Sequence, residues 1–112
     1  MKELLKTLCA LDGVSSWEDA VRDYLYAEAE PYADSLRVDA LGSLIVSKRG
    51  KKPAGNKVML CAHMDEVGLM VRRITDEGYL KFDAVGSLDR RVLLGKPVRV
   101  SPKGIPGVVG LK

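Results

Sequence analysis

Apolar residues at helical spacing define the first part of the chain. Four leucines in the first segment share one helical face: Leu4, Leu5, Leu8 and Leu11. This spacing predicts a short amphipathic helix over residues 2–11. Ser15 and Glu18 have the spacing of a capping box and predict the start of a second helix, which would end near Pro31.

Extended segments follow these helices. Residues 36–39 and 43–47 predict two strands, and the basic stretch 49–56, which contains Pro and Gly, predicts an exposed linker. Residues 58–62 form a short apolar run, which is typical of a buried strand. This strand would lead directly to His63. Chemistry is often mounted where a rigid strand ends, so this point is the first place to search for a site.

The pattern becomes purely strand-like after Gly68. Residues 69–74 and 79–83 predict two strands around a turn, and residues 97–101 and 108–111 predict two more short strands.

The fold class predicted from these elements is α/β. We place a domain boundary near Gly68–Leu69. Residues 1–68 would form a mixed-sheet α/β unit, and residues 69–112 would form a small, barrel-like β unit.

Composition places the chain among ordinary globular proteins. Hydrophobic residues make up 46% and charged residues 29%, which excludes a disordered chain. The net charge of +3 is too small to require a nucleic-acid or membrane partner, and no stretch approaches the ~20 apolar residues of a membrane span. The N-terminus has no secretory hydrophobic region, and Cys9 and Cys61 are expected to be reduced, buried thiols. We therefore expect a cytoplasmic protein.

The candidate chemistry lies at His63, the only histidine of the chain. Side chains alternate along an extended backbone, so Asp65 would point to the same side as His63 and Glu66 to the other. A carboxylate on one ring nitrogen leaves the other nitrogen free for a metal. Glu66 is only a weak candidate. Cys61 shares the face of His63, but a small apolar strand residue explains it better than a zinc ligand.

A family resemblance enters at this segment. Residues 62–71, Ala-His-Met-Asp-Glu-Val-Gly-Leu-Met-Val, resemble the signature of the TET-type metalloaminopeptidases, also called glutamyl or deblocking aminopeptidases. Residues 11–18, 37–45 and 91–98 resemble the opening turn, the first hairpin and the entry to the second domain of that family. The resemblance runs in order from about Lys2 to Lys112, and it covers only the N-terminal third of the family's enzymes.

The resemblance implies a metal-dependent peptidase. It places His63 on a metal-ligand position and Asp65 on the catalytic carboxylate of the motif His-x-Asp. The family's centre holds two divalent metal ions, zinc or cobalt, with two histidines and several carboxylates, and a glutamate serves as general base. Only the His63–Asp65 piece lies in this sequence, because the chain has no second histidine. The isolated chain is therefore expected to be inactive.

The resemblance also implies a substrate, a domain plan and an assembly. Residues 1–68 would belong to the catalytic domain, and residues 69–112 would open an inserted β domain that builds dimers. The substrate would be a peptide that loses its N-terminal residue, and the full-length enzyme would form a homo-oligomer, either a dimer or a dodecamer. No nucleic-acid or membrane partner is expected.

Two alternatives stay open at this point. The first is a non-catalytic β module for assembly or nucleic-acid binding, suggested by a basic cluster: Arg90, Arg91, Lys96, Arg99, Lys103 and Lys112. Aromatic residues for base stacking are scarce there, so a solvated or interface surface explains the cluster better. The second is glycoside hydrolysis, since some relatives carry a glucanase label. Asp65 and Glu66 make a poor carboxylate pair, because adjacent strand residues point apart.

Overall fold

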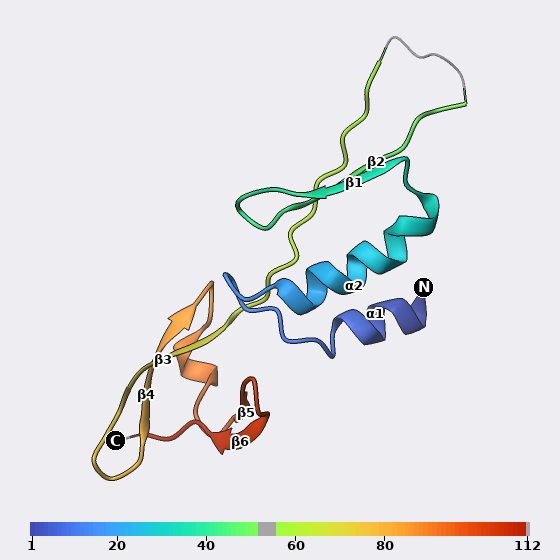
Figure 1. Cartoon of the computed structure of the whole chain (residues 1–112). Helices are drawn as coiled ribbons and strands as arrows, with labels where there is room; N and C mark the ends of the chain where they lie inside the picture. The colour runs from blue at the N-terminus through green and yellow to red at the C-terminus, as the bar shows by residue number, and fades with distance from the viewer. Residues whose placement is uncertain (52–55, 112) are drawn as a thin grey trace. The chain divides into compact units, whose positions relative to one another are not determined.

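The computed structural model describes residues 1–51 and 56–111 (Figure 1). The chain divides into two compact units, Met1–Glu66 and Val67–Lys112, and each unit is described by itself. Within the described ranges the fold is of the α/β class, with helices in the first unit and antiparallel strand pairs in both.

Two helices open the first unit. Helix α1 spans Lys2–Leu8 and helix α2 spans Asp19–Ala29, and the short 3-10 helix η1, Glu30–Tyr32, contains Pro31. Both predicted helices are confirmed. The first is shorter than expected, because the amides of Ala10 and Leu11 bond three residues back instead of four, which tightens the chain out of the α-helix.

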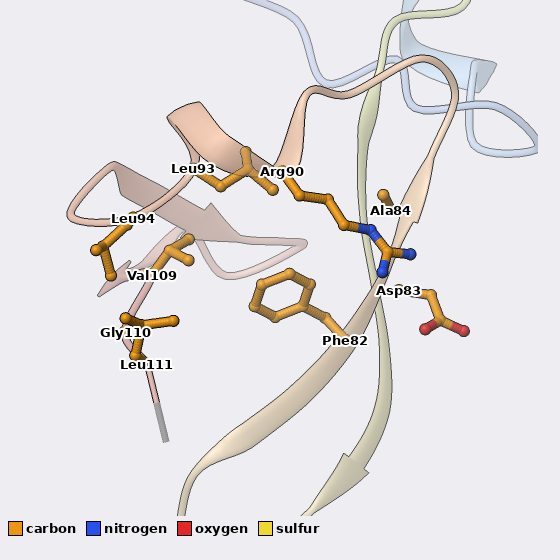
Figure 2. A pocket seen from close by; sticks show the side chains of 9 residues that line it. All are labelled: Phe82, Asp83, Ala84, Arg90, Leu93, Leu94, Val109, Gly110 and Leu111. Carbon is orange, nitrogen blue, oxygen red and sulfur yellow. The ribbon is translucent and has the colours of Figure 1, made fainter.

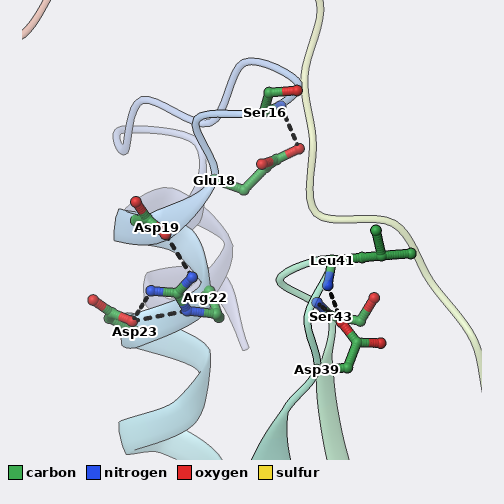
Figure 3. A network of polar contacts seen from close by, with 8 residues as sticks. All are labelled: Ser16, Glu18, Asp19, Arg22, Asp23, Asp39, Leu41 and Ser43. Atoms are coloured by element: carbon green, nitrogen blue, oxygen red, sulfur yellow. Dashed lines mark hydrogen bonds and ion pairs between the residues drawn. The ribbon is translucent and has the colours of Figure 1, made fainter.

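The predicted capping box at the start of α2 is wrong. Helix α2 begins after Glu18, and no side chain caps its first amides. The Glu18 carboxylate instead accepts a hydrogen bond from the backbone N–H of Ser16 at 2.9 Å (Figure 3). Ser16 holds a positive φ of 71°, which turns the chain between Ser15 and the helix. The hydroxyl of Ser15 is therefore available for a partner outside the helix.

Strands β1, Ser35–Val38, and β2, Leu44–Ser47, form an antiparallel hairpin that packs with α2. The connection is organised by Asp39, whose carboxylate accepts hydrogen bonds from the amides of Leu41 and Ser43, both at 2.9 Å (Figure 3). These bonds, that from Ser43 above all, lower the pKa of Asp39 below its usual value. Both predicted strands are confirmed to within a residue or two.

The best-buried hydrophobic side chain of the first unit belongs to Val21 on α2, which is 6% exposed. Gly13 lies against it, and a Cβ added to Gly13 would stand only 2.8 Å from Cγ2 of Val21. Glycine at this position lets the loop after α1 approach the helix closely. The contact places the loop that carries Ser15 beside the core of the unit.

The apolar run 58–62 is not the buried strand that its composition predicts. Val58, Met59 and Leu60 are 86%, 84% and 92% exposed, and no strand is assigned there. Burial of such a run requires paired strands on its edges and side chains over its faces. None of the strands in the described residues pairs with it. The prediction failed because it took hydrophobicity for burial.

The second unit opens with an antiparallel hairpin of β3, Gly68–Ile74, and β4, Leu80–Val85. The register shifts between Val71 and Arg73. Gly78 has a φ of +84° in the turn, a conformation that suits glycine. The predicted hairpin is confirmed.

A second hairpin follows the 3-10 helix η2, Arg90–Val92. It pairs β5, Pro97–Val100, with β6, Ile105–Val108. The last strand was expected over residues 108–111, because Pro106 and Gly107 were taken for turn residues. Proline is tolerated at the edge of a sheet, and a two-stranded hairpin consists of edges only.

Some predictions are tested only in part. The predicted linker at 49–56 lies partly outside the described residues. Strand pairs β3–β4 and β5–β6 belong to separate sheets in the described part of the second unit, so a barrel stays a prediction.

Cys9 and Cys61 are both free thiols, but both are exposed, which corrects the expectation that they are buried. None of the described helices has the length and apolar character needed to span a membrane.

Candidate functional site

The structure brings His63 and Asp65 together at the end of the exposed apolar run. Nδ1 of His63 lies 2.8 Å from Oδ1 of Asp65 and 3.0 Å from the backbone carbonyl oxygen of the same residue. The imidazole side chain is 85% exposed, whereas that of Asp65 is 40% exposed. The carboxylate thus stands behind the ring, and the ring faces solvent.

The partners of Nδ1 determine the protonation of the ring. A carbonyl oxygen can only accept a hydrogen bond, and an ionised carboxylate is also only an acceptor. Nδ1 of His63 therefore carries the proton and donates hydrogen bonds to these two oxygens of Asp65. In the neutral ring, the lone pair then lies on Nε2. This is the tautomer in which an imidazole offers Nε2 to a metal ion.

Asp65 has a second partner far away in the sequence. The hydroxyl of Ser15 donates a hydrogen bond to Oδ2 of Asp65 at 2.5 Å, across a separation of 50 positions. This bond, followed by that from His63, lowers the pKa of Asp65 below its usual value. Asp65 is therefore an anion at neutral pH, so both of its carboxylate oxygens act only as acceptors.

Glu66 joins the same two segments through its backbone and its side chain. Its N–H donates to the carbonyl oxygen of Gly13 at 2.7 Å, and its Oε1 accepts from the N–H of Gly13 at 3.2 Å. Val14 and Glu66 form a short parallel bridge. Glu66 therefore fastens the loop to the site segment, and its carboxylate is occupied by a structural bond.

The donor set fits a single metal ligand with its supporting carboxylate. Zinc and related ions accept an imidazole nitrogen, and such a ligand commonly gives its other N–H to a carboxylate. Among residues 1–51 and 56–111, no three or more His, Cys, Asp and Glu side chains gather where they could share a metal ion. These residues thus do not by themselves form a complete metal site.

Sequence reasoning missed Ser15 and Gly13 as parts of the site. Ser15 was assigned to a helix cap, since the pattern Ser-x-x-Glu fits a capping box. The position of both residues in a segment that resembles the family's opening turn was the available signal, but that signal names no contact with Asp65. Cys61 is exposed and contributes to no metal-binding group in the part of the chain described.

A cavity of about 210 Å³ in the second unit is another place to consider for a ligand (Figure 2). Its walls are mostly apolar, and they include Phe82 of β4, Leu93 after η2 and Val109 after β6. Arg90 crosses the cavity toward β4 in Figure 2. The volume falls below the ~300 Å³ at which pockets for small molecules begin. We assign no ligand to it.

The basic residues of the second unit are partly neutralised. Arg91 pairs with Asp89 at 2.7 Å, and Arg72 pairs with Asp83 at 3.3 Å. The Asp89 carboxylate also accepts from the amide of Arg91, and these bonds lower the pKa of Asp89 below its usual value. Phe82 is half-buried in the cavity wall, so one of the two aromatic rings of this unit is only partly accessible to solvent. These features do not favour a nucleic-acid interface.

Comparison with known proteins identifies the class. The sequence profile of the M42 glutamyl aminopeptidases matches residues 42–112, which is more than half of the chain. The chain belongs to this family.

Relatives and solved structures agree with the assignment. The lysyl aminopeptidase of Pyrococcus furiosus is 37% identical to this chain. The match covers 97% of this chain and 32% of the length of the lysyl aminopeptidase. A crystal structure from Thermotoga maritima, described as an endoglucanase, is 42% identical with a TM-score of 0.87, over 96% of this chain and 34% of that one. The structure of PhTET1-12s, a dodecamer in the asymmetric unit, is 40% identical with a TM-score of 0.84. The match covers 100% of this chain and 34% of the PhTET1-12s chain. The chain therefore spans about a third of the length of the relatives it matches.

Proposed function

We propose that this chain carries one ligand of the metal centre of an aminopeptidase, together with the carboxylate that orients this ligand. The observation that carries the proposal is the His63–Asp65 pair. Nδ1 donates to Asp65 at 2.8 Å, and the ring is 85% exposed. Membership of a family of aminopeptidases supports a peptidase role for this pair.

The chain's own residues would have distinct tasks. His63 would offer Nε2 to a zinc or cobalt ion, and Asp65 would keep the proton on Nδ1. A divalent metal pair in such a centre lowers the pKa of water and polarises the peptide carbonyl, which leads to removal of the N-terminal residue of a peptide. The remaining ligands and the general base would come from the part of the enzyme that this chain does not include. The chain alone would then be inactive.

We also propose the domain plan and the assembly. Residues 1–68 would form part of the catalytic domain, and residues 69–112 would open a β domain, barrel-like when complete, that joins subunits. The dodecameric assembly of PhTET1-12s supports a homo-oligomer, built from dimers, for the full-length protein. The free thiols of Cys9 and Cys61 are compatible with a cytoplasmic location.

Glycoside hydrolysis is less well supported, although one similar structure is described as an endoglucanase. Most glycosidases need one carboxyl group as acid and another as base or nucleophile across the substrate. Here the Asp65 carboxylate bonds Ser15 and His63, and the Glu66 carboxylate bonds the amide of Gly13. Neither carboxylate is available as a partner for the other.

Cobalt titration followed by NMR tests the proposal on the chain as it exists. Co²⁺ is paramagnetic, so it should broaden the ring signals of His63 first, even when a single ligand binds weakly. His63→Ala should abolish the local broadening around Asp65. Cys61→Ser is the matched control, because it removes a nearby exposed donor and should leave the broadening unchanged. Broadening that survives in His63→Ala, or disappears in Cys61→Ser, would contradict the proposal.

A further inference from the structure

The carboxylate of Asp65 is held at both of its oxygens. Oδ1 accepts a hydrogen bond from Nδ1–H of His63 at 2.8 Å, and Oδ2 accepts one from the hydroxyl of Ser15 at 2.5 Å. The terminal torsion of an aspartate is broad and nearly two-fold, so a carboxylate with one partner can rotate. With a different donor on each oxygen, rotation would break a bond. Ser15 thus restricts the group that orients the imidazole.

The loop around Ser15 is itself fastened on both sides. Before it, Gly13 exchanges two hydrogen bonds with Glu66, the residue next to Asp65. After it, the amide of Trp17 donates to the carbonyl oxygen of Val14 at 2.7 Å. The turn then continues through Ser16, whose N–H donates to the Glu18 carboxylate (Figure 3). These contacts fix the position of the Ser15 hydroxyl relative to Asp65.

We propose that Ser15 is a positioning residue for the metal ligand, acting through Asp65 on His63. This inference rests on the proposed function, since it assigns a purpose to the orientation of His63. The Ser15 hydroxyl holds the carboxylate so that Oδ1 faces Nδ1, and the Nδ1–H tautomer leaves Nε2 for the metal. Without the hydroxyl, the Asp65 carboxylate rotates more freely, and the backbone carbonyl oxygen of Asp65 at 3.0 Å is the acceptor that stays fixed near Nδ1. The ring then samples the other tautomer more often. Partners of this kind, which stand behind a ligand, change metal affinity by about 10- to 100-fold.

Four variants separate this role from a merely structural one. Ser15→Ala removes the hydroxyl. Ser15→Thr and Ser15→Val have the same shape and differ only in the hydroxyl, so this pair remains informative if Ser15→Ala unfolds the loop. Ser16→Ala is the matched control, because Ser16 contributes its backbone N–H to Glu18. None of these substitutions lies in the β1–β2 hairpin, whose amide signals should report that the first unit is folded.

The first measurement is the tautomer of His63, by long-range nitrogen–proton NMR at a pH where the ring is neutral. His63 is the only histidine, so one set of ring signals needs no assignment. We expect the Nδ1–H tautomer in the unmodified chain, Ser15→Thr and Ser16→Ala. Ser15→Ala and Ser15→Val should show a clear fraction of the Nε2–H tautomer. Equal tautomer fractions in the Thr and Val variants would overturn the proposal.

The second measurement is the cobalt affinity of the same chains. It should fall by about 10-fold in Ser15→Val relative to Ser15→Thr. Equal affinities in these two variants, with binding lost in His63→Ala, would overturn the role of Ser15 and leave the proposed function standing. Binding that persists in His63→Ala would instead overturn the proposed function, and the tautomer measurement would still decide whether Ser15 positions His63.

Discussion

Two neighbouring stretches of the first unit behave in opposite ways. Residues 58–62 are apolar and exposed, and the structure shows no backbone hydrogen bond between them and other described residues. Residues 63–66 are more polar, yet they are well connected. His63 is hydrogen-bonded to Asp65, and hydrogen bonds with Ser15 and Gly13 join the segment to the loop before α2. In the described part of the chain, the hydrophobic stretch therefore lacks backbone hydrogen bonds, and the polar stretch is the organised one.

The two stretches differ in whether the contacts that would organise them are present in this chain. The site segment is organised by the 13–18 loop, which is present in this chain. The apolar run needs strands on its edges and cover on its faces, and the described residues offer neither. Because the chain spans about a third of its relatives' length, we expect the missing contacts in the rest of such a protein. The His63–Asp65 geometry is thus held by contacts that lie within this chain.

The largest effect is expected from Asp65→Asn. An asparagine amide can donate a hydrogen bond to Nδ1, which favours the tautomer with the proton on Nε2. We expect cobalt affinity to fall about 10- to 100-fold in a titration. Asp83→Asn is the control, because Asp83 pairs with Arg72 in the second unit and should leave the affinity unchanged. Unchanged binding in Asp65→Asn would mean that the carboxylate does not orient His63.

A packing change should also break the organised segment. Gly13→Ala brings a Cβ to within 2.8 Å of Val21, so the loop or the helix has to move. Overpacking of this kind costs about 1–3 kcal/mol, which urea denaturation followed by circular dichroism measures. Gly110→Ala is the matched control, since a Cβ there meets nothing within 4 Å. Equal stabilities of the two variants would show that the 13–18 loop is not packed against α2.

The β1–β2 hairpin gives a smaller effect that depends on pH. The pKa of Asp39 is lowered by the amides of Ser43 and Leu41, so the folded state favours the ionised form. The resulting stabilisation is complete above the usual pKa near 3.8 and is lost as the pH falls through the lower folded value. NMR titration of the Asp39 carboxyl should give a pKa below that of the unfolded chain. Asp39→Asn should remove this pH dependence, and an ordinary pKa would contradict the hydrogen bonds.

The smallest effect is expected in the apolar run. Leu60 is 92% exposed, so Leu60→Lys should change the free energy of unfolding by less than about 0.5 kcal/mol. Val21→Ala, at the core, should cost about 2 kcal/mol in the same urea experiment. A large loss of stability in Leu60→Lys would show that residues 58–62 are buried in solution, which would remove the contrast between the two stretches.

The sequence predicted those elements whose contacts are close along the chain. The β1–β2 hairpin follows from alternation around a turn, and Asp39 completes that turn within four residues. Prediction from the sequence failed where the partner of a residue is remote along the chain. Ser15 was taken for a helix cap, but its hydroxyl bonds Asp65 across 50 positions. The run at 58–62 was taken for a buried strand, although hydrophobicity alone does not specify what covers it. His63 and Asp65 were found because their contact spans two residues.

Amide hydrogen exchange of the chain tests most directly whether the site segment is organised without the rest of the sheet. The N–H of Glu66 donates to Gly13 at 2.7 Å, so it should exchange far more slowly than the amides of Met59 and Leu60, which should exchange at the rate of an unstructured peptide. This result would establish that the chain itself holds the Asp65–His63 pair in place. Equally fast exchange at Glu66 and Leu60 would show that the pair acquires its geometry only in a longer protein.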